Sequence, residues 1–195
     1  MTIFTLLGLP GSGKSYYGQQ LATEFRIPFL PENATRLIHQ QGFVPGIKGS
    51  LHFDEEIYHA NVQTANNVLA ADHSVIWEGG PLQDQVFIKA RIHFSRGDAS
   101  QRQQLLTQYE RSVFQRLHSH TYYLLFDIAP PISFQRQQKR QKPELLTANL
   151  DFLAFLRQQL LLFCKTVPQQ SLIVDMHQSQ HQIINQLFHK FRQIG

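Results

Sequence analysis

Gly8-Leu9-Pro10-Gly11-Ser12-Gly13-Lys14-Ser15 matches the pattern G-x-x-x-x-G-K-S/T in full. An apolar segment, residues 2–7, precedes it, and a segment with helical spacing, residues 14–25, follows it. Glycines let such a loop wrap closely around phosphate groups, and its amide N–H groups and the helix N-terminus point towards them. We therefore expect Gly8, Gly11, Ser12 and Gly13 to bind the phosphates of ATP, with Lys14 on the β- and γ-phosphates and the Ser15 hydroxyl on Mg²⁺.

Short apolar segments alternate with helical patterns along the rest of the chain. Strands are expected at 2–7, 27–30, 74–77, 121–126 and 172–174. Helices are expected at 14–25, 34–41, 55–71 (with Asp54 as N-cap), 83–92, 100–117, 133–140, 145–164 and 181–193, and a loop at 42–49. Strands separated by helices form parallel sheets. The sequence therefore predicts a single α/β domain over 1–195, the three-layer P-loop NTPase fold with a five-stranded parallel sheet and helices on both faces.

The composition is that of a globular protein. The chain has 195 residues, 42% of them hydrophobic and 16% charged, which suits one domain. The only cysteine, Cys164, excludes an intramolecular disulfide and fits a reducing compartment. No apolar run approaches the roughly 18 residues of a membrane span, and the first ten residues carry no basic region of a signal peptide. We expect a cytoplasmic protein without a membrane partner.

The net charge of +4 is concentrated in one segment. Arg136, Lys139, Arg140 and Lys142 lie close together, and no carboxylate occurs between Asp127 and Glu144. A compact basic cluster fits a small polyanion better than nucleic acid. Arg136 and Arg140 are spaced i, i+4 on an expected helix, so both face one way. We expect them to offset charge on a transferred phosphoryl group, as part of a lid-like segment near 134–144. The alternative is a solvated basic helix face.

Four carboxylates stand at the ends of expected strands: Glu32, Glu78, Asp127 and Asp175. Ligands of open parallel sheets bind beyond these ends. We expect Glu78 to hold Mg²⁺ or its water, and Glu32 to accept the proton of an attacking hydroxyl, unless it only opens the next helix as an N-cap. Asp127 and Asp175 are interpreted as turn caps.

Further residues are candidates for the substrate. Asp84, one turn into the helix after Gly80, either contacts the substrate or only stabilises the helix dipole. Arg36, four residues after Glu32, is assigned to the substrate together with Glu32 and Asp84. Four aromatic residues could stack on a base, although each also fits the core: Phe53, Tyr58, Trp77 and Phe87.

Together these residues resemble P-loop kinases of the nucleoside and nucleotide kinase superfamily, deoxynucleoside kinases in particular. That family carries a general-base glutamate after the second strand, and Pro31-Glu32 is similar to it. After the third strand the family has a Glu-Arg-Ser motif followed by an Asp and a Phe. The similar residues here are Glu78-Gly79-Gly80, Asp84 and Phe87. Gly79 stands where the family has an arginine that helps the substrate hydroxyl and the catalytic glutamate. The lid pattern of the family, R-x-x-x-R with a later basic residue and acid, is similar to Arg136, Arg140, Lys142 and Glu144. Tyr109, in a helix expected before the fourth strand, also fits the family. Residues 31–38 are also similar to nicotinamide-riboside kinases and related ATPases.

The resemblance implies ATP-dependent phosphoryl transfer, with Mg²⁺, to a hydroxyl of a small nucleoside- or nucleotide-like acceptor. Lys14, Glu32, Arg136 and Arg140 would be the catalytic residues. It also implies a homodimer through residues 101–117. The alternative function is a module that binds ATP, hydrolyses it slowly and acts as a switch for a protein partner. Gly79 in place of an arginine beside Glu78, and the glutamine-rich surface, are compatible with this alternative. A polynucleotide kinase is disfavoured, because the basic residues form one short cluster.

Overall fold

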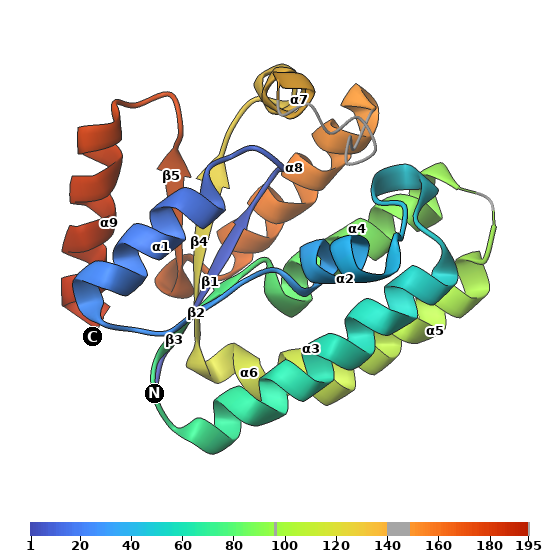
Figure 1. Cartoon of the computed structure of the whole chain (residues 1–195), viewed down its shortest axis with the longest axis horizontal. Helices are drawn as coiled ribbons and strands as arrows, with labels where there is room; N and C mark the ends of the chain where they lie inside the picture. The colour runs from blue at the N-terminus through green and yellow to red at the C-terminus, as the bar shows by residue number, and fades with distance from the viewer. Residues whose placement is uncertain (96, 140–148, 195) are drawn as a thin grey trace.

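The structure is a computed structural model that describes residues 1–95, 97–139 and 149–194 (Figure 1). Its strands form one parallel, five-stranded sheet in the order β2-β3-β1-β4-β5. They are β1 (Ile3–Gly8), β2 (Phe29–Leu30), β3 (Val75–Glu78), β4 (Thr121–Asp127) and β5 (Ser171–Asp175). Each overlaps a segment expected to be a strand, and the bounds differ by one residue at most at either end, except that β2 begins two residues later than expected. The predicted α/β class, with a five-stranded parallel sheet, is confirmed.

Helices connect the strands. They are α1 (Lys14–Phe25), α2 (Asn33–Gln41), α3 (Leu51–Ala71), α4 (Gly80–Phe94), α5 (Ala99–Tyr109), α6 (Gln115–Leu117), α7 (Pro130–Lys139), α8 (Leu150–Thr166) and α9 (Gln180–Ile194). A π-helical turn, Glu110–Phe114, joins α5 to α6, and short 3-10 turns span Gly46–Lys48, His118–His120 and Pro168–Gln170. No helix in the described part of the chain combines the length and the apolar character needed to cross a bilayer.

The sheet is covered on both faces, which explains why its central strands are apolar throughout. Alternate residues of a strand point to opposite faces, so Phe4 and Leu6 of β1 pack with α1 and α9, for example against Phe191. Leu7 packs on the other face with α4 and α8, for example against Phe152. Figure 1 shows α1 and α9 on one side of the sheet and α4 and α8 on the other, with α3 and α5 side by side farther out. The predicted three layers are therefore present.

The start of α3 differs from the prediction. The helix begins at Leu51, because the Ser50 hydroxyl caps it by accepting a hydrogen bond from the Phe53 N–H at 3.1 Å. The prediction of Asp54 as N-cap is therefore wrong. Asp54 lies inside the helix, 1% exposed, and its carboxylate pairs with Arg91 and Arg102.

Other expected helices also have different bounds; α4, for example, begins at Gly80 and ends at Phe94, whereas the expected range is 83–92. The segment expected as one helix over 100–117 is divided by the π-helical turn after Tyr109. Helix α7 begins at Pro130, before the expected start at residue 133, since proline is tolerated in a first helical turn. Asn149 caps α8 by accepting hydrogen bonds from the backbone of the first turn. Arg140 and the expected start of that helix at residue 145 lie outside the described residues.

Candidate active site

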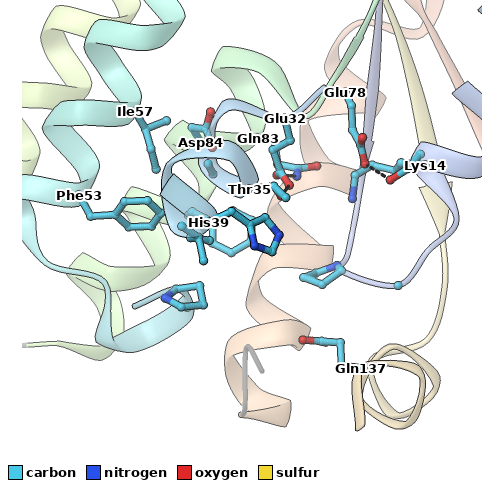
Figure 2. A pocket seen from close by; sticks show the side chains of 18 of the residues that line it. Lys14, Glu32, Thr35, His39, Phe53, Ile57, Glu78, Gln83, Asp84 and Gln137 are labelled. Carbon is cyan, nitrogen blue, oxygen red and sulfur yellow. Dashed lines mark hydrogen bonds between the residues drawn. The ribbon is translucent and has the colours of Figure 1, made fainter. Parts of the chain in front are cut away.

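A cavity of about 520 Å³ lies where β1 and β3 end, between the phosphate loop and helices α2, α3 and α4. Figure 2 shows Lys14 and Glu78 at one end of it, Phe53 and Ile57 at the other, and Glu32 between them. Gln137 of α7 also lines it. The cavity therefore joins a charged end to an apolar end, with a carboxylate in the middle.

The charged end is built on the loop from Gly8 to Ser15. Gly8, Gly11 and Gly13 have φ angles of 147°, 79° and 98°, which L side chains rarely adopt. A Cβ on Gly8 would also lie 2.7 Å from the Phe126 carbonyl oxygen. Lys14 is the first residue of α1, and its Nζ donates to the carbonyl oxygen of Gly8 at 3.0 Å. The loop thus has the tight turns and the helix N-terminus that phosphate binding requires.

The predicted phosphate-binding residues differ in their access to the cavity. Gly11, Gly13, Lys14 and Ser15 line it, whereas Gly8 and Ser12 are not among its lining residues. The Ser12 Oγ is buried and has no hydrogen-bond partner within the described part of the chain.

Ser15 and Glu78 form a pair of oxygen donors beside Lys14. The Ser15 hydroxyl donates to Glu78 Oε1 at 2.6 Å, and Glu78 is 8% exposed. Both residues line the cavity. Carboxylate and hydroxyl oxygens are ligands that Mg²⁺ accepts, usually together with water and substrate phosphates. The two side chains therefore fit the metal for which the sequence suggested them.

Glu32 lies in the middle of the cavity and is held by two side chains. Its Oε1 accepts from Gln83 Nε2 at 2.8 Å, and its Oε2 accepts from Thr35 Oγ1 at 2.8 Å. Glu32 occupies the N-cap position of α2, but its side chain makes no capping hydrogen bond. The carboxylate is thus engaged on the cavity side, where it can accept a proton.

Asp84 lines the deeper part of the cavity and belongs to a buried polar network. It is 4% exposed, and its Oδ2 accepts from Asn61 Nδ2 at 2.7 Å. Asn61 also donates to the Tyr109 hydroxyl at 3.0 Å. Burial and the nearby Glu32 carboxylate raise the pKa of Asp84 to about 8, against the opposing hydrogen bond from Asn61. Near neutral pH a protonated Asp84 can donate a hydrogen bond as well as accept one.

This raised pKa predicts a pH-dependent effect of Asp84→Asn on stability. Between the ordinary pKa of 3.8 and the folded value of about 8, the folded protein holds the proton more tightly than the unfolded chain. The contribution of Asp84 to stability is therefore lost as the pH rises through this interval. The free energy of unfolding of Asp84→Asn, minus that of the wild type, is expected to increase from about pH 5 to about pH 8.

Denaturant unfolding at several pH values measures this difference. Asp72→Asn, at the exposed end of α3, controls for the substitution itself. A difference for Asp84→Asn that is the same at every pH in the interval would contradict the raised pKa.

A buried ion cluster closes the deep end of the cavity. Arg91, 2% exposed, pairs with Asp54 and donates through Nε to the Gly46 carbonyl oxygen at 2.8 Å. Arg102 donates to the other Asp54 oxygen at 2.8 Å and to the Gly49 carbonyl oxygen at 2.7 Å. The cluster therefore holds the segment around Gly46–Gly49 against α3 and α4. Burial lowers the pKa of the Arg91 guanidinium, and the Asp54 carboxylate opposes this.

The aromatic candidates separate into two groups. Phe53 and Phe87 line the cavity, next to Ile57 and Ile88. Trp77 is completely buried in the core, and Tyr58 packs edge-on against Tyr109 with ring centroids 5.0 Å apart. Only Phe53 and Phe87 among the four therefore face the cavity.

Neither Arg36 nor Arg136, two of the basic residues predicted to act at the site, is among the residues that line the cavity. Arg136 donates to the Gly11 carbonyl oxygen at 3.1 Å, so α7 lies against the phosphate loop, where Ser133 also donates to the Pro10 carbonyl oxygen at 2.7 Å. Arg36 is exposed on α2, where it contacts Asn33 and Gln40, and is not among the lining residues. The roles predicted for Arg36, Arg136 and Arg140 remain predictions.

The two remaining strand-end carboxylates lie outside the cavity lining. Asp127 does not cap a turn through its side chain; both of its oxygens pair with Arg157, at 2.6 and 2.8 Å. Asp175 Oδ1 accepts from the His177 N–H at 2.9 Å, which is the turn cap predicted for it.

Sequence reasoning did not identify several residues of the site. Gln83, Thr35 and Asn61 make its central hydrogen bonds, and Asp54 and Arg91 line its deep end. A signal exists for Asn61, because it lies in the buried stripe of α3 formed by Phe53, Ile57, Ala65 and Val68. A polar residue in such a stripe requires a buried partner. Gln83 and Thr35 carry no comparable signal.

No protein-family model matches the chain, and no curated protein matches its sequence. Solved structures of deoxyadenosine kinase from M. mycoides match over nearly the whole length. The structure with bound dATP has a TM-score of 0.80 at 16% identity, covering 98% of this chain and 100% of that chain. The structure with products dCMP and a flexible dCDP has a TM-score of 0.78 at 14% identity, covering 99% and 100%. The structure with bound dCTP has a TM-score of 0.77 at 15% identity, with the same coverage. The chain therefore has a deoxynucleoside-kinase-like P-loop fold.

Proposed function

We propose that the protein is a nucleoside kinase, which transfers the γ-phosphoryl group of ATP to a hydroxyl of a nucleoside. One observation carries the proposal: Glu32 lies in a single cavity between a phosphate loop and an apolar pocket. A phosphoryl donor at one end and an acceptor at the other would then meet beside a carboxylate. The fold shared with deoxyadenosine kinase structures supports the same conclusion.

The donor end suits the triphosphate of ATP. The loop amides and Lys14 would hold the phosphates, and Ser15 and Glu78 would hold Mg²⁺, which neutralises charge on the β- and γ-phosphates when bound. Arg136, in contact with Gly11, is close enough to the loop to turn towards the transferred group, and Arg140 is proposed to act with it.

The acceptor end suits a flat, partly polar ring. Phe53, Ile57 and Phe87 supply apolar walls, and Asp84 supplies a polar edge that can donate and accept. Such a combination matches a nucleobase, with the sugar placed nearer to Glu32. Nucleoside-like acceptors are therefore favoured over polynucleotides, because a cavity of about 520 Å³ suits a small acceptor.

The reaction needs one proton transfer and one displacement. Glu32, held by Gln83 and Thr35, accepts the proton of the acceptor hydroxyl. The hydroxyl oxygen forms a bond to the γ-phosphorus while the bond to the bridging oxygen of ADP breaks, so that phosphorylated acceptor and ADP leave. Positioning and charge compensation by Lys14 and the loop amides supply most of the rate.

Release of ADP from Mg-ATP across a panel of acceptors tests the proposal. The panel contains the four deoxynucleosides, the four ribonucleosides, their monophosphates and nicotinamide riboside. We expect strong stimulation by at least one nucleoside. ATP binding with the same slow ADP release for every acceptor would contradict the proposal. It would favour a nucleotide-dependent switch, whose affinity for a protein partner or for a second copy of the chain changes with the bound nucleotide.

A further inference from the structure

The Gln83 side chain links the phosphate loop to Glu32. Its Oε1 accepts from the Gly8 N–H at 3.0 Å, and its Nε2 donates to Glu32 Oε1 at 2.8 Å. Because a backbone N–H can only donate, the amide oxygen faces Gly8 and the NH₂ group faces Glu32. Gln83 is 2% exposed, and it lines the cavity beside Glu32 (Figure 2). The orientation of the amide, and with it the position of the carboxylate, is therefore fixed by the loop.

Gly79 leaves the space that this arrangement uses. Its backbone has φ 75° and ψ −81°, and its N–H donates to the Leu6 carbonyl oxygen at 2.8 Å. A Cβ at this position would lie 3.1 Å from Glu32 Oε1, 3.2 Å from Glu32 Cγ and 3.4 Å from Gln83 Nε2. A side chain on residue 79 would be strained at this φ, and the Glu32 side chain would have to move by a few tenths of an ångström, whereas the distance to Gln83 Nε2 is that of an ordinary contact. The glycine therefore suits the backbone of this turn and leaves the Glu32 side chain where it is.

We propose that Gln83 is a positioning residue for phosphoryl transfer, and that it holds the Glu32 carboxylate at a position fixed relative to the phosphate loop. The inference rests on the proposed function. Gln83 belongs to the first turn of α4, the helix that follows β3, and its side chain reaches Glu32 from there. It acts through Glu32 and not on the substrate.

The geometry explains how such a residue affects rate. The Thr35 hydroxyl fixes one Glu32 oxygen from within the start of α2, whereas Gln83 fixes the other oxygen relative to the phosphate loop. The distance between the proton acceptor and the phosphoryl donor is therefore set through Gln83. Misplacement of a reacting group by about 1 Å costs about 100-fold in rate.

Two single substitutions separate the two hydrogen bonds. Gln83→Met keeps the length of the side chain and removes both. Gln83→Glu keeps an oxygen for the Gly8 N–H but replaces the donor that faces Glu32 by a second carboxylate oxygen. We expect both to lower kcat about 100-fold, with the KM for ATP changed less than about threefold. Gln85→Met is the matched control, since Gln85 is a buried α4 glutamine whose Nε2 has no hydrogen-bond partner among the described residues, and its kcat is expected to stay near that of the wild type.

A double substitution tests the hydrogen bond between the two side chains. Glu32→Gln combined with Gln83→Glu exchanges amide and carboxylate and preserves both hydrogen bonds of residue 83. We expect it to restore the Tm lost in Gln83→Glu while kcat stays low, because residue 32 then has no carboxylate to accept the proton.

Three results would overturn the inference. One is a Gln83→Met protein with kcat within about threefold of the wild type. Another is a Gln83→Met protein whose kcat is lowered in proportion to its folded fraction, measured by circular dichroism, and no further. The third is recovery of kcat together with Tm in the double variant. All three presuppose a wild type with acceptor-dependent turnover; its absence would instead overturn the proposed function, and the inference with it.

Discussion

Lys14→Ala is expected to lower kcat for phosphoryl transfer by roughly 10³-fold. Lys14 is the first residue of α1, it lines the cavity, and its ammonium group lies within the loop at 3.0 Å from the Gly8 carbonyl oxygen. From there it can reach the phosphates at the site of transfer, where negative charge must be offset. Alanine removes that positive charge and leaves the loop glycines unchanged.

The measurement is acceptor-dependent ADP release under saturating ATP. Lys89→Ala is the matched control, because Lys89 is exposed on α4 and is not among the lining residues. ATP affinity, measured by calorimetry, is expected to fall in Lys14→Ala as well. A Lys14→Ala protein that keeps more than about a tenth of wild-type kcat would show that the loop lysine is not part of the transfer machinery.

Glu32→Gln is expected to lower kcat by about 10² to 10⁴-fold while the affinity for ATP changes little. The amide keeps the size of the side chain and can still bond to Gln83 or Thr35, but it cannot accept the proton of the acceptor hydroxyl. The loss therefore falls on the chemical step.

Steady-state kinetics with calorimetry of ATP binding separates these two effects. Glu24→Gln on the exposed surface of α1 is the matched control. An unchanged kcat in Glu32→Gln would refute Glu32 as the base, even if the protein proved to be a kinase.

The fold was predictable because its signals are local. The phosphate loop fixes the order strand, loop, helix, and the apolar runs around Ile76 and Leu124 are typical of strands buried on both faces. Helix boundaries were less predictable, because they depend on which side chain supplies the cap. Ser50 and Asp54 both suit an N-cap, and only the buried partners Arg91 and Arg102 decide that Asp54 belongs inside the helix.

The candidate site was predictable only in part, for a related reason. Lys14, Glu32, Glu78 and Asp84 follow strands or open helices, so the topology of a parallel sheet brings them to one cavity. Gln83 and Thr35 belong to the site because they donate hydrogen bonds to Glu32, from a distant part of the sequence and from the next helical turn respectively. Neither residue is part of a sequence pattern that indicates such a contact. Arg36 illustrates the converse: its position near Glu32 suggested substrate binding, but its side chain lies on the exposed face of α2.

Transfer of a labelled γ-phosphoryl group from Mg-ATP to a nucleoside tests the central claim most directly. With the nucleoside that stimulates ADP release most strongly, we expect one labelled nucleoside monophosphate for each ADP formed, and neither product in Lys14→Ala above the uncatalysed background. Label that appears only in inorganic phosphate, with the nucleoside unchanged, would contradict the account and would identify the protein as a nucleotide hydrolase.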